Sequence, residues 1–263
     1  MPEGHLIHRI AEQHSQLFAG ESTIVESPQG RFSKEAQKLS GSVLEKTDAH
    51  GKHLFYHFAR DRIIHIHLGL YGKFSLFENP PGPPKGAVRL RMIGRSSGFD
   101  LNGPNQCRLI NRSQKQMVTD RLGEDPLKSD ASPDRVWEKI QTSRRPIGAL
   151  LLDQNVVAGI GNIYRTEILF LCQINPQTLA VDLTKNQFDE IWQLTCELME
   201  LGKQMNRIIT RNATATRSTT NPRKTRERFN IYKKPECPNC GKPIYYWTLA
   251  NRTVYACEYC QPY

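Results

Sequence analysis

Cys237-Pro238-Asn239-Cys240 and Cys257-Glu258-Tyr259-Cys260 are two Cys-x-x-Cys pairs near the end of a chain of 263 residues. Two thiolates two residues apart can hold one metal ion from a tight turn, and a second pair completes a tetrahedron. Four thiolates leave no open coordination position, so the ion is expected to be structural. We therefore predict one structural zinc ion bound by Cys237, Cys240, Cys257 and Cys260, against the alternative of incidental or disulfide-bonded cysteines.

The residues between the two cysteine pairs have the pattern of a β-hairpin. Residues 244–248 and 253–255 alternate as strands around Ala250-Asn251-Arg252. A unit of this size buries too little surface to fold by burial alone, so metal binding would supply most of its folding energy. We expect a C-terminal zinc finger over residues 230–263 with Arg252 at its tip. A guanidinium there suits a phosphate, although by itself Arg252 could equally be an ordinary exposed arginine.

Positive charge is concentrated in the same part of the chain. The whole chain carries +10, and residues 201–263 hold 12 Lys or Arg against three acids, which is +9. A localised basic surface is typical of proteins that bind a polyanion, most often nucleic acid, with an anionic membrane or a solvated loop as alternatives. No apolar run approaches bilayer length and no signal peptide is recognisable, so we expect a cytoplasmic protein without membrane contact.

A glycine-rich turn precedes a predicted helix in the middle of the chain. Gly159-Ile160-Gly161-Asn162 leads into an amphipathic segment, and Asn162 stands where a helix cap is expected. The amides at a helix N-terminus favour a phosphate, which predicts a DNA-backbone contact at Gly161 and Asn162. The alternative is a helix-packing joint that needs small residues.

The remaining patterns predict an α+β chain of several domains. One helix from Glu3 to about Phe18 and strand alternations such as residues 62–68 and 88–92 indicate an antiparallel sheet assembly over residues 1–118. Helical patterns indicate a second domain over residues 119–208. The basic stretch 209–229 has few apolar residues, and we expect a mobile loop there.

Five motifs occur in the order found in one enzyme family. They are Pro2-Glu3-Gly4, Gly51-Lys52-His53, the run from His67 to Gly72, the run from Leu152 to Tyr164, and the terminal cysteine hairpin with Arg252. In this order the chain resembles the formamidopyrimidine-DNA glycosylase and endonuclease VIII family along its whole length. The resemblance implies an N-terminal β-sandwich with a helix, a helix-two-turn-helix domain and a zinc-finger β-hairpin. It also implies a monomer that binds damaged double-stranded DNA in a bacterial, nucleoid-associated location, with single-stranded DNA as a second candidate partner.

The resemblance implies a bifunctional DNA glycosylase and abasic-site lyase of base excision repair. Pro2, once Met1 is removed, would be the nucleophile, because an amine attacking C1′ of the sugar forms an iminium that permits β,δ-elimination. An α-amino group has a pKa near ~8 and is partly neutral at physiological pH without drastic tuning. Glu3 would be the acid and base. Lys52 would bind the sugar-phosphate and assist departure of the base, and Arg252 would complete the set.

Leu70 and Tyr71 match the loop that endonuclease VIII inserts into DNA when a base leaves the stack. They and Gly4 favour the endonuclease VIII branch and oxidised pyrimidines, although ordinary strand-end packing would also explain the pair. Gly69 stands where the bacterial endonuclease VIII loop carries glutamine. This departure weakens the match of the wedge. An 8-oxoguanine-directed glycosylase of the same family is an alternative.

Two rival functions come from other classes. One is a non-catalytic protein that binds damaged DNA, against which an intact Pro2, Glu3 and Lys52 argue. The other is a metallohydrolase built on five histidines, which lack a nearby carboxylate in the strand pattern and more simply fit packing or hydrogen bonding: His50, His53, His57, His65 and His67.

Overall fold

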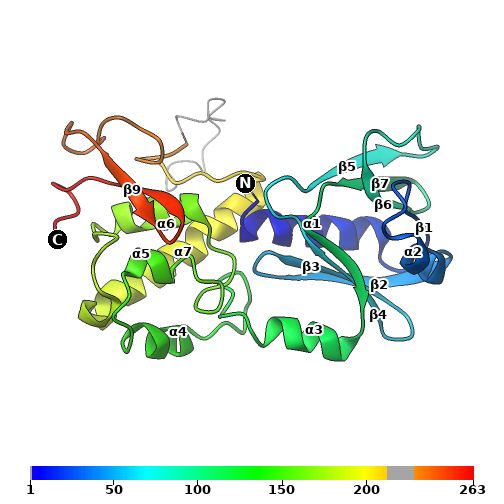
Figure 1. Ribbon diagram of the computed structural model, residues 1–263, viewed down its shortest axis with the longest axis horizontal. Coiled ribbons are helices and arrows are strands. Elements are labelled where there is room, and N and C mark those ends of the chain that lie inside the picture. The colour runs from blue at the N-terminus through cyan, green and yellow to red at the C-terminus, as the bar shows by residue number, and fades with distance from the viewer. Residues whose placement is uncertain (1, 212–227) are drawn as a thin grey trace. The chain divides into compact units, whose positions relative to one another are not determined.

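The computed structural model describes residues 2–211 and 228–263 (Figure 1). The chain forms two compact units: unit 1 comprises Met1–Glu3 and Ile7–Arg121, and unit 2 comprises Gly4–Leu6 and Leu122–Tyr263. Each unit is described by itself. Most of the expected loop at 209–229 lies outside the described residues. Among the residues described, no helix has both the length and the apolar character needed to cross a bilayer.

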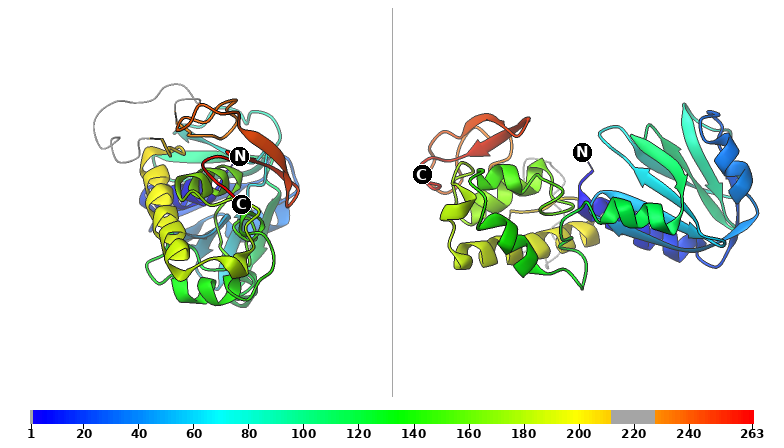
Figure 2. Two further views of the ribbon diagram at one scale, coloured as in Figure 1. Left: turned by 90° about the vertical axis from the view of Figure 1, so that its left-hand side faces the viewer. Right: turned by 60° about the horizontal axis from the view of Figure 1, so that its bottom comes forward.

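Unit 1 is built on eight antiparallel strands in the order β5-β7-β6-β1-β2-β3-β4-β8 (Figure 2). The pairing of β1 with β2 rests on two residue pairs, Ser22↔Val43 and Thr23↔Ser42, so the sheet divides there into two four-stranded halves. The expected β-sandwich and the strands at 62–68 and 88–92 are confirmed. The strands are β1 (Ser22–Glu26), β2 (Ser42–His50), β3 (His53–Phe58), β4 (Arg62–His67), β5 (Lys73–Glu78), β6 (Val88–Ile93), β7 (Ser97–Asn102) and β8 (Gln106–Ile110).

Helix α1 (Gly4–Phe18) contributes its apolar face to the core of both sheet halves. The His14 ring stacks on Phe99 of β7 at 4.7 Å and bonds the Tyr56 hydroxyl of β3 at 2.6 Å. Burial lowers the pKa of His14 to about 3, so this histidine is a neutral core residue at physiological pH. One expected helix in unit 1 is therefore confirmed at the predicted place, and two short helices, α2 (Ser33–Leu39) and α3 (Arg112–Thr119), were not predicted.

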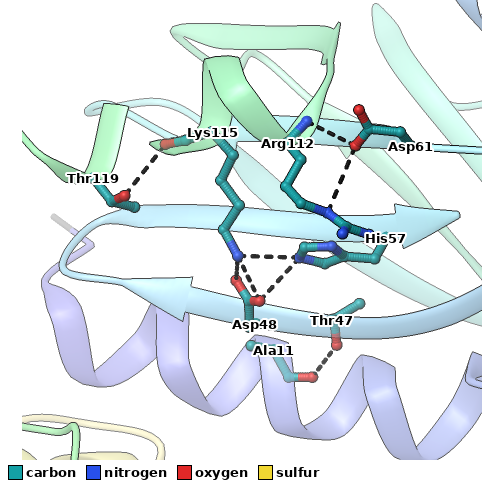
Figure 3. A network of polar contacts seen from close by, with 8 residues as sticks. All are labelled: Ala11, Thr47, Asp48, His57, Asp61, Arg112, Lys115 and Thr119. Atoms are coloured by element: carbon teal, nitrogen blue, oxygen red, sulfur yellow. Dashed lines mark hydrogen bonds and ion pairs between the residues drawn. The ribbon is translucent and has the colours of Figure 1, made fainter. Parts of the chain in front are cut away.

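Helix α3 is tied to the sheet by a half-buried ionic network (Figure 3). Lys115 Nζ lies 2.8 and 2.7 Å from the two oxygens of Asp48, and His57 Nε2 lies 2.9 Å from Asp48 Oδ2. Burial alone would raise the pKa of Asp48, but hydrogen bonds from His57 and Lys115 and the charge of Lys115 lower it to about 2. The Asp48 carboxylate therefore stays ionised at physiological pH and holds the end of unit 1 in place.

Unit 2 contains the expected helical domain and the expected hairpin. Its longest helix, α7 (Lys185–Met205), begins with a capping box between Thr184 and Gln187 and buries one apolar face. The hairpin of β9 (Tyr245–Leu249) and β10 (Arg252–Ala256) turns at Ala250 and Asn251, both of which have positive φ, as a two-residue hairpin turn requires. The other elements are α4 (Pro133–Ile140), α5 (Ile147–Leu150), α6 (Asn162–Leu171) and the 3₁₀ turn Ala180–Asp182.

Candidate functional site

The first turn of α1 is anchored in unit 2 on the glycine-rich turn. The amide of Gly4 donates to the carbonyl of Gly159 at 2.9 Å. A Cβ on Gly4 would lie 2.8 Å from Gly159 Cα, so the two backbones can approach this closely only because residue 4 is glycine. This bond fixes the backbone of Gly4, the residue that follows Pro2 and Glu3 in the chain.

Glu3 and Pro2 lie immediately before this anchor. Glu3 occupies the N-cap position of α1 with extended backbone, and its side chain is buried. Sequence reasoning without the family would have made Glu3 a surface residue. Pro2 is half-buried.

The glycine turn is held by a side chain that the sequence did not single out. Gln154 accepts from the Gly159 amide at 3.0 Å and donates to the Ile160 carbonyl at 3.0 Å. One amide side chain thus closes the loop from both sides. Gln154 lies only five residues before Gly159 in the sequence. Its role could still not be predicted, because a glutamine in a loop has no distinctive spacing.

The prediction that Asn162 caps the following helix is wrong. The N-cap of α6 is Gly161, with no side-chain cap, and Asn162 is the first helical residue. Its side-chain nitrogen donates instead to the carbonyl of Thr253 on the hairpin at 2.8 Å. Its side-chain oxygen accepts from the Arg165 guanidinium. Both ends of the Asn162 amide group are therefore used to bridge α6 and the hairpin. Asn162 thereby joins the helix start to the zinc finger within unit 2.

Arg165 is a fully buried arginine that completes this junction and was missed by the sequence analysis. Its guanidinium donates to the carbonyls of Gly148 at 3.2 Å and Leu249 at 3.1 Å, and to the side-chain oxygen of Asn162. It also reaches the carbonyl of Arg252 at 3.5 Å. The rigid fork of donors therefore holds Asn162 and the hairpin tip in one geometry. The acceptors are 84 and 87 residues away in sequence, so no local pattern could have revealed it.

Glu167, two residues after Arg165 on α6, forms a second buried junction. Its oxygen Oε2 accepts from Thr210 Oγ1 at 2.5 Å and from the Asn230 amide at 2.7 Å, and Oε1 accepts from the amides of Ile231 at 2.9 Å and Tyr232 at 2.7 Å. The Asn230 side chain adds a fifth donor at 3.0 Å. This carboxylate fastens the chain on both sides of residues 212–227 to the helix that begins at the glycine turn.

The four cysteines of the predicted zinc site come together at one end of the hairpin. Their sulfur atoms all lie within 4.8 Å of one another, with Cys237 and Cys260 at 3.7 Å and Cys240 and Cys257 at 3.5 Å. A tetrahedral ion with Zn–S bonds of about 2.3 Å needs sulfurs roughly 3.8 Å apart, so the set fits one ion. None of the seven cysteines, all of which lie in the described residues, forms a disulfide.

Gln261 supports this cluster and was also missed by the sequence analysis. It is fully buried, accepts from the Cys257 amide at 3.1 Å and donates to the Ile174 carbonyl at 2.7 Å. Its own carbonyl accepts from Asn175 at 3.0 Å. The second cysteine pair is therefore fixed to the helical part of unit 2.

Lys52 and the Leu70-Tyr71 pair lie at the same end of the unit 1 sheet. Lys52 is half-buried in the turn between β2 and β3, and the register His53↔His67 puts this turn beside the loop that follows β4. In that loop the Gly72 amide donates to the Leu68 carbonyl at 3.0 Å. The tight turn presents Leu70 and Tyr71 to solvent, 49% and 83% exposed. Both side chains are therefore accessible to a binding partner.

The five histidines do not assemble a metal site. Among the residues described, the four cysteines are the one group of three or more ligands placed to hold an ion. His53 Nδ1 lies 2.8 Å from His65 Nε2, and the rings stack at 5.1 Å. Burial of the ring lowers the pKa of His53 to about 3, and the charge of the neighbouring His65, when protonated, contributes to this shift. The expected packing and hydrogen-bonding role is confirmed for this pair.

Comparison with known proteins identifies the family. Residues 1–104 match the model of the formamidopyrimidine-DNA glycosylase N-terminal domain, and residues 122–214 match that of the formamidopyrimidine-DNA glycosylase H2TH domain. "Endonuclease 8 1" of Mycobacterium tuberculosis (strain ATCC 25618 / H37Rv) is 42% identical over 267 aligned positions, covering 99% of this chain and 100% of that protein. The chain belongs to the formamidopyrimidine-DNA glycosylase family. Membership confirms the expected enzyme class, a DNA glycosylase and abasic-site lyase.

Other relatives place this glycosylase within the family. "Endonuclease 8" of Pectobacterium carotovorum is 26% identical over 99% of this chain and 100% of that protein. A formamidopyrimidine-DNA glycosylase of Bacillus cereus is 30% identical over 86% of this chain and 83% of that protein. The Mycobacterium protein at 42% supports the expected endonuclease VIII branch.

Solved structures confirm the fold of this glycosylase. Lactococcus lactis Fpg bound to DNA with an abasic site superposes with a TM-score of 0.83 at 23% identity, over 99% of this chain and 100% of that one. MutM bound to DNA with carbocyclic 8-oxo-G gives a TM-score of 0.83 at 24% identity, over 100% of both chains. The expected sheet, helical and hairpin architecture is confirmed.

Proposed function

We propose that this glycosylase removes oxidised bases from double-stranded DNA, with pyrimidines favoured, and uses Pro2 as its nucleophile. The observation that carries the proposal is the bond between the Gly4 amide and the Gly159 carbonyl, because it fixes Gly4, the residue that follows Pro2 and Glu3 in the chain, to the turn that would hold the DNA backbone. After removal of Met1, the Pro2 nitrogen is a secondary amine. It attacks C1′ and the bond from C1′ to the base breaks, the base leaving with a proton. The nitrogen then loses its own proton, and opening of the sugar ring at the C1′–O4′ bond gives the positively charged iminium.

Glu3 and Lys52 assist this step. The buried Glu3 carboxyl delivers a proton to the sugar ring oxygen as the ring opens, and its carboxylate form then takes up a proton during elimination. Lys52 attracts the adjacent phosphate from the turn between β2 and β3. The iminium makes the C2′ proton acidic, so β-elimination breaks the bond to the 3′ phosphate and δ-elimination releases the 5′ phosphate.

The DNA backbone is held by the α6 junction. The start of α6 at Gly161 and Asn162 presents the positive end of a helix dipole, and Arg252 adds a guanidinium from the hairpin tip. The four cysteines hold one structural Zn²⁺, which keeps the hairpin folded and takes no part in the chemistry. The buried Arg165 supports this arrangement because it binds both Asn162 and the hairpin tip.

Leu70 and Tyr71 serve as the wedge that replaces a flipped base. Their exposure on a tight turn supports this role, since an apolar and an aromatic side chain in solvent gain contact only when a partner covers them. The named relatives of the endonuclease 8 type support a preference for oxidised pyrimidines over 8-oxoguanine.

Borohydride trapping on abasic-site duplex tests the reaction. We expect a covalent protein–DNA band with the processed wild-type protein, loss of most of that band with Pro2→Gly, and residual trapping with Lys52→Ala. An absence of any trapped band together with tight binding of the duplex would instead support a non-catalytic DNA-binding protein. A panel of duplexes with thymine glycol, dihydrouracil and 8-oxoguanine then ranks the lesions.

A further inference from the structure

An aromatic ladder crosses the face of the zinc-finger hairpin that carries Tyr246. Tyr246 and Tyr255 are directly opposed across the strands, and their ring centroids are 6.1 Å apart. Tyr232 packs edge-on against Tyr255 at 5.3 Å, and Phe229 packs against Tyr232 at 5.6 Å. We call these four residues the aromatic ladder.

The outer end of the ladder is open to solvent. Tyr246 is 72% exposed, whereas Phe229 at the other end is buried against the helical core. Strand alternation puts Tyr246 and Tyr255 on the face opposite to Val254 and Ala256, which are buried. Folding of unit 2 therefore does not use the exposed face of the Tyr246 ring.

Positive side chains are interleaved with these rings. The Arg228 guanidinium lies 5.5 Å from the centre of the Phe229 ring, and Lys233 Nζ lies 5.7 Å from the centre of the Tyr232 ring. A similar pair, Lys242 with Tyr259 at 5.4 Å, lies in the cysteine-rich end of the hairpin, where Tyr259 is 62% exposed. The surface thus combines exposed aromatic faces with cations in the part of the chain that holds most of the net positive charge.

We propose that the aromatic ladder binds an unpaired strand of DNA, with Tyr246 stacking on a base and Lys233 and Arg228 attracting the backbone. Aromatic faces between cations suit single strands because every unpaired base offers a face for stacking and every nucleotide carries a phosphate. Bases inside a duplex are already stacked on one another, so they cannot use the ladder. The surface is distinct from the junction of Asn162 and Arg252, because the Arg252 side chain alternates to the other face of the hairpin. The inference rests on the proposed function only in taking DNA as the partner.

Fluorescence anisotropy with a labelled oligothymidylate at one fixed salt concentration tests the proposal. We expect Tyr246→Ala to weaken binding roughly 5- to 150-fold, the equivalent of about 1–3 kcal/mol for one lost base stack. Tyr246→Phe should keep the affinity within about twofold, since the ring face is retained. The matched control is Tyr245→Ala, which removes the same side chain from the adjacent position on the opposite face.

Two outcomes would overturn the proposal. One is equal affinity of Tyr246→Ala and Tyr245→Ala for the oligothymidylate, and the other is a wild-type protein that does not bind it. Cleavage of an abasic-site duplex is measured on the same samples and should be unchanged in Tyr246→Ala. If the wild-type protein does not cleave the duplex but binds the oligothymidylate in a way that depends on Tyr246, the proposed function is refuted and the proposal for the aromatic ladder is supported.

Discussion

Glu167→Gln removes one charge and one acceptor from a site where five donors converge on a buried carboxylate. The amide group of glutamine can replace either oxygen. If it replaces Oε2, it faces the hydroxyl of Thr210 and both nitrogens of Asn230; if it replaces Oε1, it faces the amides of Ile231 and Tyr232. Either orientation leaves two N–H donors without an acceptor, because the Thr210 hydroxyl can accept from the glutamine amide and donate to the Arg228 carbonyl.

The expected cost follows from this geometry. A buried donor left without a partner costs about 1–3 kcal/mol, so two of them cost about 2–6 kcal/mol of the free energy of unfolding of unit 2. Urea denaturation followed by tryptophan fluorescence measures it, because all three tryptophans, Trp137, Trp192 and Trp247, belong to unit 2. With a urea slope of about 2 kcal/mol per molar, the midpoint should fall by roughly 1–3 M.

The matched control is Glu190→Gln, the same substitution on an exposed position of α7. It should change the free energy of unfolding by no more than about 0.5 kcal/mol. A Glu167→Gln midpoint within the range of this control would refute the view that the carboxylate fastens Thr210 and residues 230–232 to α6.

Three further predictions concern the ion pair, the metal and the buried arginine. Lys115→Met should destabilise unit 1 near neutral pH. The folded-state pKa of Asp48, about 2, is below its ordinary value near 3.9. The difference in stability between the wild type and Lys115→Met should therefore be present above about pH 4 and vanish as the pH falls through about 2. Thermal unfolding followed by circular dichroism measures it. A strong zinc chelator should shift the Trp247 emission as the hairpin loses order, and added zinc should restore it, whereas an unchanged spectrum would count against a structural ion. Arg165→Met should weaken binding of abasic-site duplex roughly 10- to 150-fold, since one oriented hydrogen bond to a charged phosphate is worth about 1.5–3 kcal/mol. Arg165→Lys should restore part of the affinity, and equal affinity of all three proteins in an anisotropy titration would remove Arg165 from the DNA-holding group.

Local spacing made most of the fold predictable. The cysteine pairs and the strand alternation of β4 are signals within a few residues, and the structure has both where they were expected. The long apolar face of α7 is equally local. In each of these cases the partners that the residues need are nearby in the chain or are supplied by a metal ion, so the pattern suffices.

The junctions of unit 2 could not be predicted because their partners are remote in sequence. Asn162 has a residue type that caps helices, yet a carbonyl 91 residues away competes for its side chain and wins. Arg165 and Glu167 look like the polar residues of an exposed helix face, yet both are fully buried. Arg165 is bonded to the β9–β10 hairpin, and Glu167 is bonded to residues 230–232. The catalytic interpretation of Pro2 and Lys52 depended on the family resemblance, since neither residue type has a distinctive spacing.

Mapping of the borohydride-reduced adduct by mass spectrometry tests the central claim most directly. The trapped complex is digested with nuclease and protease, and the peptide that carries the sugar remnant is sequenced. The proposed reaction predicts that the remnant is attached to the nitrogen of Pro2 in a peptide that lacks Met1. A remnant on a lysine side chain, or an active enzyme that retains Met1, would contradict it.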